Sequence, residues 1–281
     1  MYLVIGATGN VGSEVVNQLI SRGQDVRALV RSEDRASALP AGVSYAVGDL
    51  DDTASLTAAA QGAEGVFFMQ LAPSTEQAQG FIDAVQAAGV GKVVLLSSLG
   101  TLLHPAPTIG QLIAARDAVF RSSTLDVTYL YASGLMSNAT WWAETIRSSK
   151  QVVDATEPGK IGVVDPFDIG RVAAIALSEA GHAGKGYLLT GPEALSPSEM
   201  TATLSNVLGA ELAFVASTPE AEADKALAKG TPEFMARARQ NLDELFRAGR
   251  AGVITDDVQN LTGQPATPFR TWAVKHADLF A

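Results

Sequence analysis

The segment Gly6-Ala7-Thr8-Gly9-Asn10-Val11-Gly12 follows a short apolar run, 2–7, that is typical of a buried strand. Apolar residues then recur with a helical spacing through 11–22, so the glycine-rich turn joins a strand to a helix. A pyrophosphate needs close approach of the backbone and free N–H groups at a helix N-terminus, and glycines spaced in this way provide both. The segment predicts a dinucleotide-binding unit, although a tight turn without a ligand is the simpler alternative.

The chain continues as an alternation of short apolar runs and helical patterns. We expect further strands at 26–30, just before Gly48, and at 65–69, 92–97 and 127–131. We expect the intervening helices at 55–60, 76–88 and 111–122. Strands separated by helices of this length imply βαβ units with right-handed crossovers. The pattern therefore predicts an α/β fold with a doubly wound parallel sheet, the Rossmann arrangement.

The regular alternation of expected strands and helices ends after Gly134. A helix expected at 168–178 and a strand at 186–189 return the chain to the main sheet. The later segments read as mostly helical, with one strand near 211–215 and an amphipathic helix at 232–247. We therefore expect a Rossmann domain formed by 1–134 and 165–190. The smaller, mostly helical substrate domain is expected to comprise 135–164 and 191–281.

Composition excludes several classes of function. The net charge of −10 and the absence of a dense basic run argue against a nucleic-acid partner. The chain has no cysteine, which excludes disulfides, thiolate metal ligands and cysteine nucleophiles, and we predict no metal site. It also has no apolar run of about 20 residues and no secretory signal, so a cytoplasmic protein without a membrane partner is expected.

The end of the second expected strand bears on the choice of cofactor. An NAD site usually carries an acidic residue there, to accept hydrogen bonds from the ribose hydroxyls. This sequence has Arg31 instead, whose guanidinium can pair with a 2′-phosphate, and Ser32 and Arg35 could assist. NADP(H) is therefore predicted over NAD(H), with a surface arginine as the alternative. Asp49 either accepts from the adenine amino group or caps the next helix.

Other cofactor contacts are expected where strands end, because ligands bind at the carboxyl edge of such sheets. Phe68 could instead be part of the core, and the hydroxyls of Ser97 and Ser98 could satisfy local backbone groups. The full set of predicted cofactor-binding residues is Gly6, Ala7, Thr8, Gly9, Asn10, Val11, Gly12, Arg31, Ser32, Arg35, Asp49, Leu50, Phe68, Met69, Ser97 and Ser98.

These motifs together, the glycine-rich turn, Val30-Arg31, Gly48-Asp49-Leu50 and Ser97-Ser98, resemble the NmrA-like branch of the atypical short-chain dehydrogenases. The resemblance continues through 125–138, 164–173, 189–196 and 255–263. It implies an NADP-binding Rossmann domain, a small C-terminal domain and a substrate between them. Some members of this group reduce quinones with NADPH, others are redox-sensing regulators, and others are tailoring enzymes of secondary metabolism.

The usual proton donor of short-chain dehydrogenases is missing. They carry Tyr-x-x-x-Lys on the helix after the Ser97-Ser98 strand, where this chain reads Gln-Leu-Ile-Ala-Ala-Arg-Asp from Gln111. His104, in the loop after the Ser97-Ser98 strand, and Tyr131, at a strand end, are the remaining candidates for catalysis. A solvated histidine and a packing tyrosine are the alternatives. Asp168 is interpreted as a helix N-cap rather than a catalytic acid.

An aromatic and sulfur-containing patch suits a flat ligand. We predict that the substrate contacts are Gln70, Met136, Asn138, Trp141, Trp142, Met235 and Phe246. The first hypothesis is an NADPH-dependent oxidoreductase that reduces a quinone or similar conjugated carbonyl, which needs no strong acid. The second is a non-catalytic NADP(H)-binding redox sensor, and the third is a reductase that tailors an aromatic metabolite. The expected partner is a flat, aromatic or quinoid small molecule. The sequence does not decide between a monomer and a homodimer.

Overall fold

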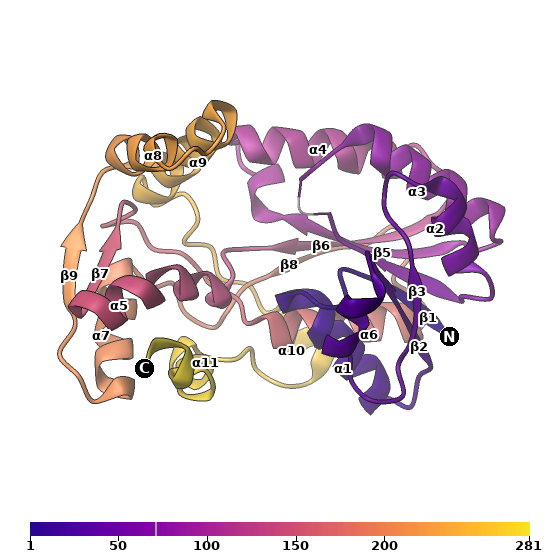
Figure 1. Cartoon of the computed structure of the whole chain (residues 1–281), viewed down its shortest axis with the longest axis horizontal. Helices are drawn as coiled ribbons and strands as arrows, with labels where there is room; N and C mark the ends of the chain where they lie inside the picture. Colours follow the sequence, from indigo (N-terminus) through magenta and orange to yellow (C-terminus); the bar gives the residue numbers. More distant parts are fainter. Residues whose placement is uncertain (71) are drawn as a thin grey trace.

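The computed structural model describes residues 1–70 and 72–281. Its main sheet has seven strands in the order β3-β2-β1-β4-β5-β6-β8, all paired in parallel (Figure 1). The strands are β1 (Tyr2–Ile5), β2 (Val26–Val30), β3 (Ser44–Val47), β4 (Gly65–Phe68), β5 (Lys92–Ser98), β6 (Asp126–Ala132) and β8 (Gly186–Leu189). The strand order reverses between β1 and β4, which is the position where such sheets bind ligands. The predicted doubly wound parallel sheet is confirmed.

Helices cover both faces of this sheet (Figure 1). One face carries α2 (Thr53–Ala60), α3 (Thr75–Ala87) and α4 (Thr108–Arg121), and the other carries α1 (Asn10–Ser21) and α6 (Pro166–Ser178). Successive side chains of a strand point to opposite faces of the sheet, so each strand contributes apolar side chains to both layers of the core. In β1, Val4 packs under α1 and α6, whereas Leu3 and Ile5 pack on the opposite side. Each layer therefore has its own continuous apolar core.

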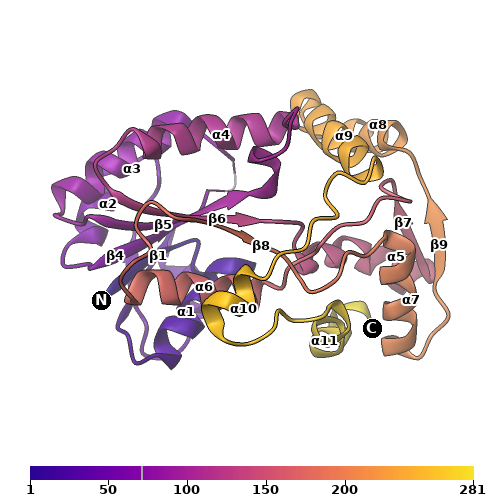
Figure 2. The same ribbon diagram turned by 180° about the vertical axis from the view of Figure 1, so that it is seen from behind.

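A smaller region covers the carboxyl edge of the sheet. Its two-stranded sheet pairs β7 (Gln151–Asp154) in parallel with β9 (Ala213–Ala216). Around it lie the 3₁₀ helix η3 (Met136–Trp142) and α5 (Ala143–Ser149), α7 (Pro197–Leu208), α8 (Pro219–Ala228), α9 (Glu233–Arg247) and α11 (Phe269–Lys275). Figure 2 shows α9 against the start of α4, where Asn241 Oδ1 accepts a hydrogen bond of 2.9 Å from Thr108 N.

The structure departs from the sequence predictions at three places. Strand β7 was not predicted. Helix α10 (Asp257–Thr262) packs on α6, and Val258 belongs to that core, so this part of 191–281 lies with the main sheet. Asp168 is not the cap of α6, because Asp165 accepts from Phe167 N instead. No helix among the described residues is both long and apolar enough to cross a bilayer.

Asp168 instead fixes a junction between α6 and a later segment of the chain. Its carboxylate is fully buried. Oδ1 forms an ion pair with Arg171 Nη2 at 2.8 Å, and Oδ2 accepts a hydrogen bond from Thr267 N at 2.6 Å. Pro166 at the start of the helix moves the cap three residues upstream of the predicted position. The role of Asp168 is therefore structural.

Candidate nucleotide and acceptor site

The turn between β1 and α1 requires glycine at two positions. Gly6 has a φ of +76°, and a Cβ there would lie 2.6 Å from Met69 Sδ. A Cβ on Gly12 would lie 2.0 Å from the carbonyl oxygen of Gly6, because α1 packs directly against the turn. The turn is closed by a 2.9 Å hydrogen bond from Gly9 N to Gly6 O. This close packing leaves room for a ligand only on the outer side of the loop.

The N-terminus of α1 is exposed to solvent. Gly9 is the N-cap, and among the described residues no side chain caps this end and no acidic residue lies in the first turn. Thr8, Gly9 and Asn10 are exposed, whereas Ala7 and Val11 have buried side chains and can offer only their main chain. Free N–H groups and the positive end of the helix dipole favour a phosphate here. The turn therefore fits a dinucleotide pyrophosphate.

Arg31 and Asp49 meet at the ends of β2 and β3. Arg31 Nε lies 3.9 Å from Asp49 Oδ2, and the arginine side chain is 82% exposed. Asp49 does not cap α2, since Asp52 accepts from Ala54 N at 3.0 Å and from Ser55 N at 3.1 Å. The capping alternative for Asp49 is wrong. Its Oδ1 accepts from Asp51 N at 3.1 Å, and its side chain is 50% exposed.

The segment after Arg31 forms the short 3₁₀ helix η1 (Glu33–Ala38). Ser32 is its N-cap residue, and its hydroxyl interacts with Asp34, which lowers the pKa of that carboxyl. Arg35 is exposed on the same turn. Both residues therefore lie beside Arg31 at the edge of the sheet, as a 2′-phosphate site would require.

One of the predicted strand-end contacts needs correction. The side chain of Phe68 is fully buried and packs against Phe81 and Phe120, with ring centroids 4.4 Å and 5.1 Å away. Only the main chain of Phe68 can meet a cofactor. Leu50 is half-buried against the same core. Met69, by contrast, lies over Gly6 at the carboxyl edge.

Ser97 is bound within a buried polar cluster, which also corrects the prediction. Its Oγ donates to Asp117 Oδ2 at 2.5 Å. Arg116 donates to Asp117 Oδ1 through Nε at 3.0 Å and Nη2 at 2.6 Å, and Nη2 also donates to the carbonyl of Leu96. The Ser97 hydroxyl is therefore committed inside the protein. Ser98 Oγ accepts from Gly100 N and caps the 3₁₀ helix η2 (Leu99–Thr101).

Sequence reasoning missed the pair Arg116 and Asp117, whose side chains are 2% and 0% exposed. The helix was noted only for lacking a tyrosine and a lysine. A signal was present, because two adjacent opposite charges interrupt an otherwise largely apolar stretch of α4. Charged residues are rarely fully buried unless paired, so the pattern indicated a buried ion pair beside β5.

Neither predicted catalytic residue lies in the cleft. Tyr131 stacks on Tyr129, and its hydroxyl accepts from Arg121 Nη2 at 3.3 Å, at the far end of α4. Its ring is thereby directed away from the carboxyl edge. His104 is exposed, and its carbonyl accepts a hydrogen bond from Arg250. Both are absent from the cavity lining among the described residues, so their predicted catalytic role finds no geometric support.

A cavity of about 360 Å³ opens directly beyond β6, beginning at Gly134. Five predicted substrate residues line it, namely Met136, Asn138, Trp141, Trp142 and Phe246. Two others do not. Gln70 donates to Gln77 Oε1 at 2.6 Å and accepts from Ser74 N, and Met235 is exposed on α9 outside the lining. The cavity joins η3 and β7 to α8 and α9.

Side-chain contacts between η3 and α9 form one wall of this cavity. Arg239 lies over the ring of Trp141, 4.7 Å from its centroid, and its Nε donates to Asp243 Oδ1 at 2.7 Å. Asp243 is buried, and that burial raises the pKa of its carboxyl. Trp141 stays 61% exposed, so its ring covers the cavity rather than filling the core.

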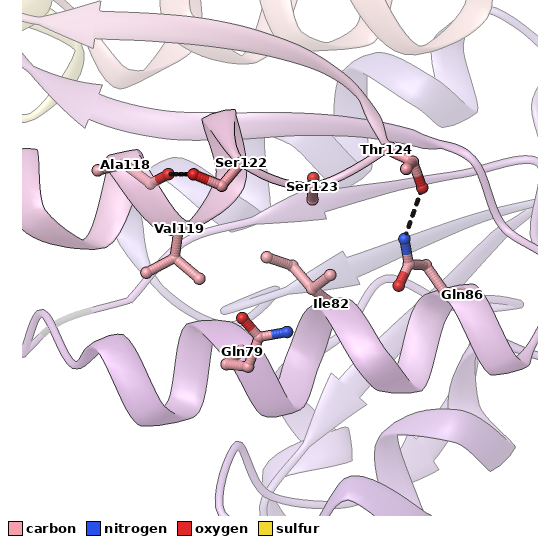
Figure 3. A pocket seen from close by; sticks show the side chains of 8 residues that line it. All are labelled: Gln79, Ile82, Gln86, Ala118, Val119, Ser122, Ser123 and Thr124. Carbon is pink, nitrogen blue, oxygen red and sulfur yellow. Dashed lines mark hydrogen bonds between the residues drawn. The ribbon is translucent and has the colours of Figure 1, made fainter.

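A second hollow lies between α3 and α4 (Figure 3). In it Gln86 Nε2 donates to Thr124 Oγ1 at 2.8 Å, and Thr124 lies just before the start of β6. The hollow is thus at the amino edge of the sheet, opposite the glycine turn. It cannot serve the nucleotide.

The open helix N-terminus, the two glycines and the strand-order reversal define a dinucleotide-binding Rossmann protein. A family model described as NAD(P)H-binding matches residues 6–179. The chain belongs to this NAD(P)H-binding family, whose model covers more than half of it. The nucleotide-binding prediction is thereby confirmed.

Two relatives match the whole chain. It is 36% identical to the (4-alkanoyl-5-oxo-2,5-dihydrofuran-3-yl)methyl phosphate reductase of Streptomyces griseus and 34% identical to the NAD(P)H azoreductase of Xenophilus azovorans, covering 100% of this chain and 99% of each relative. A solved NADPH-dependent quinone oxidoreductase of Escherichia coli, complexed with NADPH, superposes with a TM-score of 0.86. It shares 26% identity, with 99% of this chain and 100% of that chain covered.

Proposed function

We propose that the protein is an NADPH-dependent oxidoreductase that reduces a quinone or similar conjugated carbonyl by hydride transfer. The observation that carries this proposal is the aromatic cavity immediately beyond the carboxyl end of β6, adjacent in the sheet to the end of β5. An acceptor there lies at the edge where the nucleotide binds. The named activities of the relatives, an azoreductase and a quinone oxidoreductase, support the same class of acceptor.

Different residues of the nucleotide site bind different parts of NADPH. Bound NADPH supplies the hydride from its nicotinamide ring. The N–H groups at the start of α1 hold the pyrophosphate, and Gly12 keeps that helix close enough to the turn to present them. Arg31 pairs with the 2′-phosphate, and Asp49 accepts from the adenine amino group.

Reduction of such an acceptor needs little acid catalysis from the residues of the chain. Ser97 already donates to Asp117, Tyr131 faces Arg121, and His104 is exposed outside the lining. A quinone or conjugated carbonyl is already electrophilic, and water can protonate its reduced form. The chain therefore acts mainly by orienting a flat acceptor between Trp141 and Phe246 and by excluding bulk water.

The proposal is tested by following NADPH absorbance with and without a panel of simple quinones. We expect quinone-dependent oxidation well above the enzyme-free rate. A Trp141→Ala variant should raise the KM for the quinone while leaving NADPH affinity unchanged, because Trp141 lines only the acceptor cavity. Absence of oxidation by protein that binds NADPH saturably would overturn the reductase proposal. It would favour the redox sensor.

The cofactor preference has its own test at Arg31. Arg31→Ala is expected to weaken NADPH binding by about tenfold to a hundredfold, since charge-assisted bonds to a phosphate contribute about 1.5–3 kcal/mol. NADH has no 2′-phosphate, so its affinity should change little. Titrations of both nucleotides by protein fluorescence give the comparison, with Arg237→Ala on the exposed side of α9 as the matched control. Equal losses for the two nucleotides would remove the phosphate assignment.

A further inference from the structure

We propose that the acceptor cavity selects by charge, so that it takes neutral or cationic aromatic acceptors and rejects anionic ones. The proposal rests on the proposed function and names the chemical class of the acceptor. Its basis is the polar wall opposite the aromatic residues. Among the described residues, four ionisable side chains line the cavity, and three of them are carboxylates: Asp154, Glu222 and Asp243.

Among the described residues of the lining, the one cation already has two partners. Arg239 gives its Nε to Asp243 at 2.7 Å and its guanidinium face to Trp141 at 4.7 Å. An anionic substituent would have to displace one of these partners to gain the arginine. Burying Asp243 without its cation would leave an uncompensated charge, which proteins tolerate poorly. Arg239 is therefore part of the wall and not a receptor for anions.

Asp154 is the carboxylate that a ligand would meet. Its Oδ1 accepts from Thr156 N at 2.8 Å and Thr156 Oγ1 at 2.6 Å. In residues 1–70 and 72–281 no lysine or arginine nitrogen lies within ion-pair distance of it. Glu222, by contrast, is paired with Lys225 at 2.7 Å. The lining thus contains one negative charge that a cationic substituent can neutralise.

The charges of the other two carboxylates act on Asp243. Asp154 and Glu222 both raise the pKa of Asp243 through their charges, after the larger effect of burial. Two further cations are also occupied: Lys225 pairs with Glu222, and the exposed Arg247 donates to the carbonyls of Ala155 and Ser217. The field inside the cavity is therefore negative, and in a partly desolvated space it is weakly screened.

The test uses three naphthoquinones with one ring system and one substituent each, separated from the ring by a methylene group. The substituents are a neutral hydroxyl, an anionic sulfonate and a cationic trimethylammonium. Binding to the NADP⁺ complex is read from quenching of tryptophan fluorescence, with Trp141→Phe identifying the reporter. Reduction is read as kcat/KM with NADPH. We expect the cationic quinone to be preferred over the anionic one by about tenfold or more, equivalent to about 1.4 kcal/mol.

Asp154→Asn is the decisive variant, because asparagine keeps an oxygen to accept from Thr156 and removes only the charge. It should reduce the preference for the cationic over the anionic quinone by about tenfold. Asp224→Asn is the matched control, since Asp224 is an exposed carboxylate on α8 outside the cavity lining. That control should keep the original preference.

The outcomes separate the two proposals. Fluorescence ranking by charge without any NADPH oxidation would uphold charge selection and overturn the reductase activity. An anionic quinone that binds as well as the neutral one would overturn charge selection, whatever the rate of oxidation. So would a preference that Asp154→Asn leaves unaltered, or a failure of all three compounds to bind.

Discussion

Replacing Gly12 with alanine is expected to weaken NADPH binding by about a hundredfold or more, equivalent to about 3 kcal/mol. The added Cβ would lie 2.0 Å from the carbonyl oxygen of Gly6 and 2.5 Å from its carbonyl carbon. Both atoms are main chain, so no side-chain rotation relieves the contact. Helix α1 must then move away from β1, and its first N–H groups leave the position where they would meet the pyrophosphate.

The measurement is a fluorescence titration with NADPH, accompanied by circular dichroism to establish that the variant is folded. Gly91→Ala is the matched control, since a Cβ there meets nothing within 4 Å and its φ is not positive. We expect the control to bind as the unmodified protein does. Unchanged NADPH affinity in folded Gly12→Ala protein would contradict the assignment of this turn to the pyrophosphate.

Truncation of Asp117 is expected to have the largest effect on stability. Asp117→Ala should lower the free energy of unfolding by about 3–5 kcal/mol, because Arg116 would be left as an uncompensated buried charge. Ser97 would lose its acceptor at the same time. Ser97→Ala removes only one hydrogen bond from the cluster and should cost about 1 kcal/mol.

Urea unfolding followed by circular dichroism measures both losses. A double variant, Arg116→Met with Asp117→Leu, provides the control, since it replaces both charges with apolar groups of similar size. It is expected to be more stable than Asp117→Ala alone, because neither charge remains unpaired. If the double variant were the less stable of the two, the buried ion pair would not be the source of the effect.

The arrangement of the main sheet could be predicted because it depends on local patterns. The glycine spacing before Val11, the two-residue alternation in the strands and the apolar period of the helices are each visible within about 15 residues. Connection lengths then leave few topologies. The predicted nucleotide turn and the position of Arg31 beside Asp49 follow from this local order.

The direction of side chains at strand ends was harder to predict. Phe68, Ser97 and Tyr131 all lie near the carboxyl edge, yet each points into or over the layer under α3 and α4. The alternation within β5 carried a signal, because Val93 and Leu95 share that layer and Ser97 continues their register. Sequence position alone placed these residues at the edge without deciding the face.

The cavity was predictable only in part, because its walls come from separate segments. Trp141 and Phe246 were recognised by their chemistry, but the carboxylates of Asp154 and Asp243 look like ordinary surface residues in the sequence. Their burial and proximity depend on how η3, β7 and α9 pack together. Non-local packing of this kind leaves no periodic trace in one chain.

The parallel pairing of β7 with β9 affects the kinetics of folding. Gln151 is paired with Ala213, and the chain between them first runs through α6 and β8, which complete the main sheet. A hairpin could form early and alone, whereas this pair must close a long loop before its contacts form. We therefore expect refolding in two phases, with amides of the main sheet protected from hydrogen exchange before those of β7 and β9. Nucleotide affinity should accordingly recover sooner than the acceptor pocket.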